Sequence, residues 1–165
     1  MNVRRLASSR GQGLVEFAVI FPIFMSLIFL VFDGGIVMGR YAEMNNASKE
    51  GARLAATGVS ETTIITRTRQ HARGLVDTAT TDCTAYNAST SAICVDWLDR
   101  EDGDGIRNAG QVGSAVRVRV KYNYPMITPL INRVVNGIDV ETCAIMRLEK
   151  PIPNPPETAG VDKTC

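Results

Sequence analysis

The sequence predicts an α+β protein: a long N-terminal membrane-spanning helix continues into a small head with a short helix and an antiparallel sheet. Three patterns indicate this fold. Residues 17–32 are apolar except for Pro22 and Ser26, and no further proline occurs before Ala56. Residues 64–76 carry apolar side chains at helical spacing, and residues 116–121 alternate between valine and a basic residue, which is typical of a half-buried strand.

The composition excludes several classes of protein. The chain has 165 residues with 18 basic and 17 acidic side chains, and this net charge of +1 argues against binding nucleic acid through bulk positive charge. Hydrophobic residues at 45% and charged residues at 21% exclude a disordered chain. Outside the apolar segment, the rest of the chain is long enough for one small hydrophobic core.

The apolar segment is long enough to cross a bilayer. A spanning helix needs about 20 apolar residues, within a range of roughly 17–25, and residues 14–31 reach the lower end of that range. Basic residues precede the segment and acidic residues follow it: Arg4, Arg5 and Arg10, then Asp33 and Glu43. This bias places the N-terminus in the cytoplasm and the bulk of the chain outside.

A cleaved secretory signal is the alternative interpretation of the same segment, because arginines before an apolar run are typical of such signals. However, no Ala-x-Ala site follows the apolar run, and Val37-Met38-Gly39 is a poor substitute. A retained single-pass anchor is therefore the preferred interpretation.

The helix is expected to continue beyond the apolar run. Ala47, Gly51 and Ala55 recur at every fourth position, which gives one helical face that another part of the backbone can approach closely. One helix over residues 14–56 would be roughly 65 Å long at 1.5 Å per residue. The alternative is two helices broken at Gly34-Gly35.

The head is expected to begin after Gly58. Ser60 can cap a short helix with the apolar positions Ile64, Ile65, Ala72, Leu75 and Val76 on one stripe. Three segments have the pattern of strands, namely residues 92–98, 116–121 and 138–148. Prolines at positions 151, 153, 155 and 156 indicate an extended tail over residues 151–165.

Four cysteines lie on the predicted outer side of the membrane: Cys83, Cys94, Cys143 and Cys165. An even number of cysteines in an oxidising compartment implies disulfides, and four cysteines allow three connectivities. Cys83 and Cys94 are close in sequence, so that pair is favoured, which leaves Cys143 with Cys165. A free Cys165 at the chain end is the alternative.

Acidic residues are concentrated between positions 82 and 104, where six acids accompany one base. Four of them, Asp99, Glu101, Asp102 and Asp104, precede Gly105 in a pattern that resembles half of a calcium loop. The same register puts Arg100 at the first ligand position and Gln111 where a bidentate glutamate belongs. Ca²⁺ is the one cofactor that this segment would take, and a solvated acidic turn is the preferred interpretation.

The sequence offers no enzyme motif. His71 is the one histidine, and its neighbours on a polar helix indicate a surface position rather than a catalytic base. Arg117, Arg119 and Lys121 form a basic strand face, which is more typical of a solvated surface than of a polyanion site.

Three separated motifs resemble the TadE-like family, the minor pilins or pseudopilins of the tight-adherence branch of type IV pili. They are GQGLVEF at residues 11–17 with Pro22 in the apolar run, DGG at residues 33–35, and KEGARLAA at residues 49–56. The chain departs from the commonest family pattern at Lys49 and Gly35, and neither departure touches the N-terminal motif.

The resemblance implies a leader that a prepilin peptidase removes on the cytoplasmic face. Cleavage after Gly11 would make Gln12 the new N-terminus and Glu16 its fifth residue, while Gly13 is a second candidate for the scissile glycine. In an assembled pilus, Glu16 would pair with the free N-terminal amine of a neighbouring subunit. Alternatively, Glu16 simply lies at the level of the lipid headgroups, where a carboxylate costs little.

The implied organisation is a cytoplasmic leader (1–11), a transmembrane and extended helix (12–58), an extracytoplasmic head (59–150) and the tail. The implied function is that of a structural minor pilin in the bacterial cytoplasmic membrane or in a surface pilus. Its partners would be other pilin subunits, the prepilin peptidase, inner-membrane assembly proteins and membrane lipid, with no nucleic acid. The alternative is a single-span anchored binding module that holds Ca²⁺ or a ligand and never enters a fibre.

Overall fold

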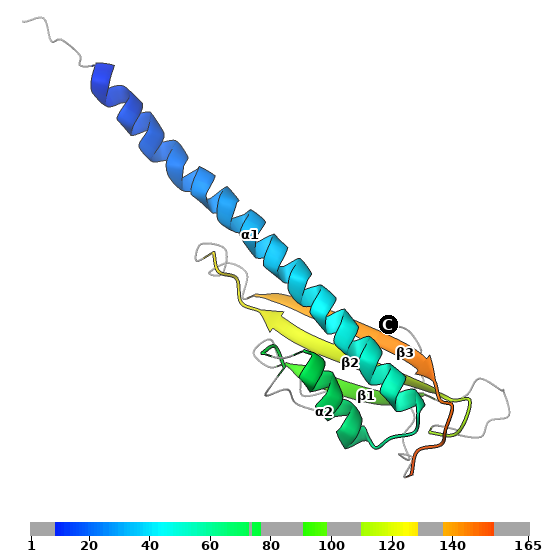
Figure 1. The fold of residues 1–165 in the computed structure, drawn as a ribbon. Coiled ribbons are helices and arrows are strands. Elements are labelled where there is room, and N and C mark those ends of the chain that lie inside the picture. The colour runs from blue at the N-terminus through cyan, green and yellow to red at the C-terminus, as the bar shows by residue number, and fades with distance from the viewer. Residues whose placement is uncertain (1–8, 73, 77–90, 99–109, 129–136, 154–165) are drawn as a thin grey trace, which may run out of the picture.

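The computed structural model describes residues 9–72, 74–76, 91–98, 110–128 and 137–153. It contains two helices and three strands in the order α1 (Ser9–Ala56), α2 (Glu61–His71), β1 (Ala92–Leu98), β2 (Ala115–Tyr124) and β3 (Ile138–Arg147). The predicted α+β fold is confirmed. Figure 1 shows α1 as a long rod whose C-terminal part lies on the head and whose N-terminal part extends away from it.

Helix α1 is continuous over 48 residues, which corresponds to roughly 72 Å at 1.5 Å per residue. The alternative of a break at Gly34-Gly35 is wrong, because both glycines keep helical geometry. Pro22 lies inside the helix and cannot donate a backbone hydrogen bond to the preceding turn. The Ser26 hydroxyl donates to the Pro22 carbonyl at 2.8 Å, one turn later.

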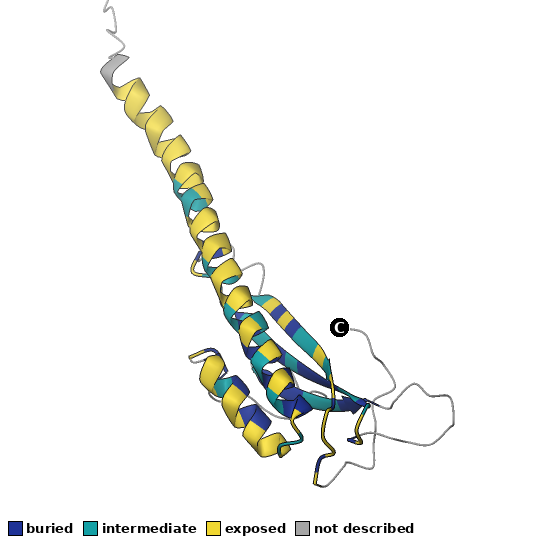
Figure 2. Cartoon of the chain, turned by 45° about the vertical axis from the view of Figure 1, so that its right-hand side comes forward, coloured by how far each residue is buried: buried dark blue, intermediate teal, exposed yellow. Residues whose placement is uncertain are grey.

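The two halves of α1 have different surroundings. The projecting half (residues 11–32) is mostly exposed, whereas the docked half (residues 33–56) buries Met44, Ala47, Ala52 and Ala55 completely. Figure 2 shows this contrast as a yellow rod that acquires dark blue patches where it reaches the head. The helical periodicity predicts that Asn46, Lys49, Glu50 and Arg53 lie mainly on the side away from the head. Asn46, Lys49 and Arg53 are exposed, whereas Glu50 is half-buried.

The sheet is antiparallel with the strand order β1-β2-β3. Its side chains alternate between two faces, so Val116, Val118 and Val120 of β2 share one face and Arg117 and Arg119 the other. Helices α1 and α2 pack against the valine face. All three predicted strands are therefore present, and the alternation identified the correct buried face of β2.

Two clusters of buried side chains form the core between the helices and the sheet. One joins Met44 of α1 to Ile65, Ile93 and Val120. The other cluster joins Ala52 and Ala55 of α1 to Ile64 and Trp97, and it also includes Ile152. The core thus extends along α1 from Met44 to Ala55 rather than around a single point.

Helix α2 ends before the last residues of the apolar stripe that the sequence predicts. It ends at His71, and Leu75 and Val76 are buried from the turn that follows. Ser60 occupies the N-cap position, but its hydroxyl lies 2.9 Å from the Thr63 hydroxyl and makes no capping bond to the backbone. His71 is exposed, as predicted.

The end of α1 is joined to the segment after β3. The Glu149 backbone N–H donates to the Ala56 carbonyl at 2.9 Å. Gly58 follows with a φ of 77°, and a Cβ at that position would lie 2.8 Å from the Pro151 carbonyl oxygen. Ile152 is 9% exposed and its N–H donates to the Gly110 carbonyl at 3.0 Å. The chain is therefore packed on the head as far as Ile152.

Gly51 is the tightest point of the stripe of small residues on α1. A Cβ at this position would collide with the Thr68 hydroxyl of α2 and lie 3.2 Å from a methyl group of Val118 in β2. Helix α1 packs this closely against α2 and β2 because residue 51 has no side chain. Side chains of α2 and β2 therefore approach the small-residue face closely at Gly51, and the approach of another backbone to this face stays a prediction.

We expect Gly51→Ala to destabilise the head. The steric cost of overpacking, about 1–3 kcal/mol, exceeds the roughly 1 kcal/mol that alanine gains over glycine inside a helix over all but the lowest part of that range. Thermal unfolding of the full chain in detergent measures the effect. Gly39→Ala is the matched control, because a Cβ there has nothing within 4 Å. Adding Thr68→Ala to Gly51→Ala should restore part of the stability. Equal melting temperatures for the Gly51 and Gly39 variants would contradict the packing argument.

Candidate functional site

The projecting half of α1 presents an apolar surface that no described part of the chain covers. Most of its large hydrophobic side chains, from Leu14 to Phe32, are between 44% and 71% exposed, and Met25 and Ile28 are half-buried. The most apolar window has a mean hydropathy of 2.6 and contains no buried residue. The helix is long and apolar enough to cross a membrane. This length and exposure indicate a membrane anchor.

The predicted processing residues lie in the first turns of this half. Helix α1 begins at Ser9, so Gly11, Gln12 and Gly13 have helical backbone geometry. All three residues are exposed, and a Cβ at Gly11 or Gly13 would meet nothing within 4 Å. The Gln12 amide nitrogen donates to the Glu16 carboxylate at 3.2 Å, one turn later. The structure thus brings Gln12 and Glu16 together on one helical face.

Asp33 forms the junction between the two halves of α1. Its side chain is 1% exposed and accepts four hydrogen bonds from the end of β2 and the loop that follows it. The donors are the Thr128 hydroxyl at 2.6 Å, the Ile127 N–H at 3.0 Å, the Thr128 N–H at 3.1 Å and the Tyr124 hydroxyl at 3.3 Å. Both carboxylate oxygens are therefore satisfied by the head, which offsets the cost of removing the charge from water.

Tyr124 is a buried member of this junction. Its burial, and then the negative charge of Asp33, raise the pKa of the Tyr124 phenol above its ordinary value. The phenol is protonated at neutral pH even at its ordinary pKa, so it is able to donate to the carboxylate. A charged phenolate beside Asp33 would instead repel it.

Sequence reasoning did not find the partners of Asp33. It identified Asp33 only as a charge at the outer end of the apolar segment. The donors were not found because they lie 91–95 residues further along the chain. The available signal was weak. An isolated acid after a long apolar run needs a partner, and the sequence Tyr-Pro-Met-Ile-Thr supplies hydroxyl and backbone donors after a strand.

The basic side chains of β2 are paired with acids of the two neighbouring strands. Asp96 of β1 accepts a hydrogen bond from Nε of Arg117 at 3.0 Å and from Nε of Arg119 at 2.8 Å. Glu141 of β3 pairs with Lys121 at 3.1 Å. Arg117 is 7% exposed, so the interpretation of this face as solvated is wrong for that residue. Asp96 belonged to the predicted acidic segment, but its position in β1 makes it a partner of the arginines.

Two cysteines lie in described strands. Cys94 of β1 and Cys143 of β3 are both disulfide-bonded, and both are opposite Arg119 of the central strand. Two strand spacings separate them by roughly 9.5 Å, which exceeds the distance that a disulfide spans. A Cys94–Cys143 bond is therefore excluded. Cys83 and Cys165 lie outside the described residues, and the favoured pairing of Cys83 with Cys94 stays a prediction.

The predicted calcium loop is untested. Asp99, Glu101, Asp102 and Asp104 all lie outside the described residues. The preference for a solvated acidic turn over a Ca²⁺ site consequently stays a prediction.

We expect Asp33→Ala to release the loop after β2 from α1. The Ile127 and Thr128 N–H groups would lose their acceptor, so their amide hydrogens should exchange faster with solvent, on the order of tenfold. Hydrogen–deuterium exchange of the full chain measures this, with strand β3 as an internal reference. Glu43→Ala removes a half-buried acid from the same helix, one that is ion-paired within α1 rather than with the loop, and should leave the loop unchanged. Unchanged exchange of residues 125–128 in Asp33→Ala would show that other contacts hold the loop.

The comparisons with known proteins point to one family. The model of the family described as TadE-like protein matches residues 11–53. No curated protein matches the chain, and no solved structure matches it. The matched segment comprises nearly all of α1, including the processing residues, Glu16, Asp33 and most of the docked half. The resemblance to the TadE-like family is thereby confirmed, and residues 11–53 are the part of the chain that carries it.

Proposed function

We propose that this chain is a minor pilin or pseudopilin of a tight-adherence type pilus, a structural component of a surface fibre or of its assembly machinery. One observation carries the proposal. The segment that matches the TadE-like family is a single helix with an exposed apolar half and a half that docks on a folded head. Such a subunit can be held in lipid by one end and display the other.

The topology follows from the charges that flank the anchor. The arginines before residue 11 favour an N-terminus in the cytoplasm and a head on the outer side of the bacterial cytoplasmic membrane. The prepilin peptidase would then meet residues 11–13 on the cytoplasmic face. The assembly proteins and the other subunits would meet the helix and the head.

The surroundings of the processing site support removal of a leader. No described side chain packs on Gly11 or Gly13, so unwinding the first turns of α1 would break backbone hydrogen bonds but no core contacts. Cleavage after Gly11 would place a new amine on Gln12, one turn from the Glu16 carboxylate that its own side chain already contacts. The amine of a neighbouring subunit would compete with that internal bond.

We expect the mature protein to begin at Gln12, as measured by N-terminal sequencing of membrane-extracted protein. A chain that begins at Leu14 would move the cut to Gly13 and keep the proposal. A chain that begins at Met1 or Asn2 would favour the anchored binding module, and one that begins near Arg40 would indicate an ordinary signal peptide. Gly11→Ala and Gly13→Ala are matched variants, because neither added methyl group meets a neighbour. Only the variant at the scissile glycine should slow processing.

We expect Glu16→Ala to lower incorporation into the fibre without affecting leader removal or membrane insertion. The gross attraction of a close pair of unit charges at an effective dielectric of about 20 is about 4 kcal/mol, and desolvation offsets much of it, so a loss of about tenfold in incorporation is expected. Quantifying the subunit in sheared fibres against the membrane fraction measures it. Glu43→Ala, which removes an acid from the docked half, is the control. Normal assembly of Glu16→Ala would mean that this carboxylate has no pairing role.

A further inference from the structure

The loop after β2 is held at a fixed height along α1. Two backbone N–H groups and two hydroxyls of residues 124–128 bond to the one carboxylate of Asp33. Backbone donors leave the loop little freedom to slide along the helix. The position of Asp33 relative to a membrane therefore also sets the position of the loop.

Asp33 lies at the outer boundary of the apolar segment. Between Glu16 and Asp33 there is no charged residue, and this interval spans about 25 Å at 1.5 Å per residue. The hydrocarbon core of a bilayer is about 30 Å thick. If Glu16 lies at the inner headgroups, Asp33 lies at or just inside the outer edge of the hydrocarbon. Such a depth is tolerable for Asp33 because its carboxylate is covered by the loop.

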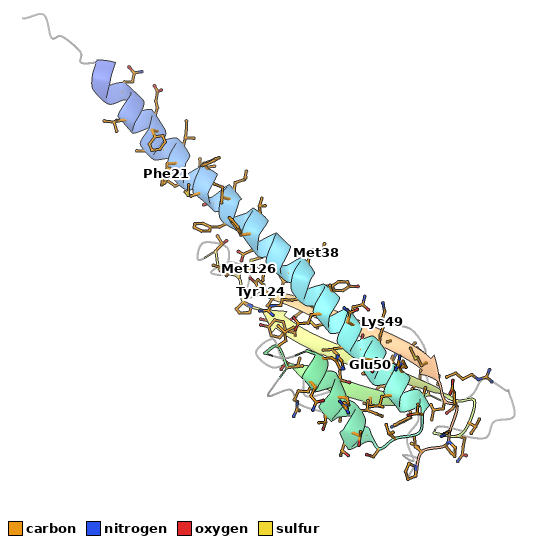
Figure 3. All side chains as sticks on the ribbon, in the orientation of Figure 1. Phe21, Met38, Lys49, Glu50, Tyr124 and Met126 are labelled. Carbon is orange, nitrogen blue, oxygen red and sulfur yellow. The ribbon has the colours of Figure 1, made fainter. Side chains whose placement is uncertain are left out.

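The loop has the side chains of a surface that contacts lipid. Residues 122–128 contain no charge. Pro125 is exposed, Met126 is half-buried, and Ile127 is 61% exposed. On α1, Phe32 and Met38 are also exposed, at 63% and 71%. Figure 3 shows Met126 and Tyr124 beside α1, beyond the exposed part of the helix that carries Phe21.

We propose that residues 125–127 lie in the outer headgroup layer of the membrane that α1 crosses, with the Ile127 side chain in contact with the acyl chains. This inference rests on the anchored location given above. It adds a second membrane contact made by the head. The observation that favours lipid over a protein partner is continuity: the loop is bonded to α1 at Asp33, the first charged residue after the exposed apolar run, so both would meet the same bilayer.

Quenching of tryptophan fluorescence by brominated lipids tests the proposal. The full chain is reconstituted into phosphatidylcholine vesicles with bromine either near the headgroups or near the bilayer centre. Ile127→Trp reports on the loop, and Pro125→Trp is a second reporter should the first disturb folding. Val112→Trp is the matched control, because Val112 is 52% exposed but lies before β2, at the end of the strand away from the loop. Phe24→Trp reports on the anchor. Wild-type protein, with buried Trp97, gives the baseline.

We expect shallow bromines to quench the added emission of Ile127→Trp more strongly than deep bromines do, as for a side chain at the headgroup–acyl boundary, and to leave Val112→Trp unchanged. Deep bromines should quench Phe24→Trp. Quenching of Phe24→Trp without quenching of either loop reporter would overturn the loop contact and leave the anchor intact. Absence of quenching in all variants would overturn both. Equal quenching of Ile127→Trp and Val112→Trp would show adsorption of the whole head and also overturn the proposal.

Discussion

The hydrogen bonds of the Asp33 carboxylate determine how the membrane-length part of this protein is joined to its head. A helix that leaves a bilayer can rotate and tilt freely unless something fixes its direction. Here four donors from the end of β2 and its loop converge on one side chain of α1, and the small residues of the docked half then lie against the valine face of the sheet. The carboxylate fixes the height of the head, and the core fixes its rotation about the helix.

Much of this fold could be predicted because its elements are long and regular. The apolar run and the spacing of Ala47, Gly51 and Ala55 identified both halves of α1, and the alternation in residues 116–121 identified the central strand and its buried face. A break at Gly34-Gly35 was a reasonable alternative, since each glycine costs about 1 kcal/mol in a helix interior. The bonds to Asp33, immediately before that pair, help to keep this part of the helix ordered.

The contacts of the charged side chains could not be predicted, because they join residues that are far apart in sequence. Asp96 looked like part of an acidic segment and is instead the partner of two arginines on the neighbouring strand. Its role depends on the strand register, which the sequence pattern does not specify. The same holds for Asp33, whose donors belong to a loop that looked like a simple break between strands. Periodicity predicts which face a residue occupies, but it does not predict its partner.

The end of α1 has a mechanical consequence. The last turn of the helix is bonded to the segment after β3 through Glu149, next to Gly58 and Pro151, and the strands run alongside the helix (Figure 1). A force that pulls the helix along its axis would therefore load the strands lengthwise. Lengthwise loading shears many hydrogen bonds of the ladder together, whereas a sideways pull would break them one after another. A subunit built in this way resists tension best in the direction of its own helix.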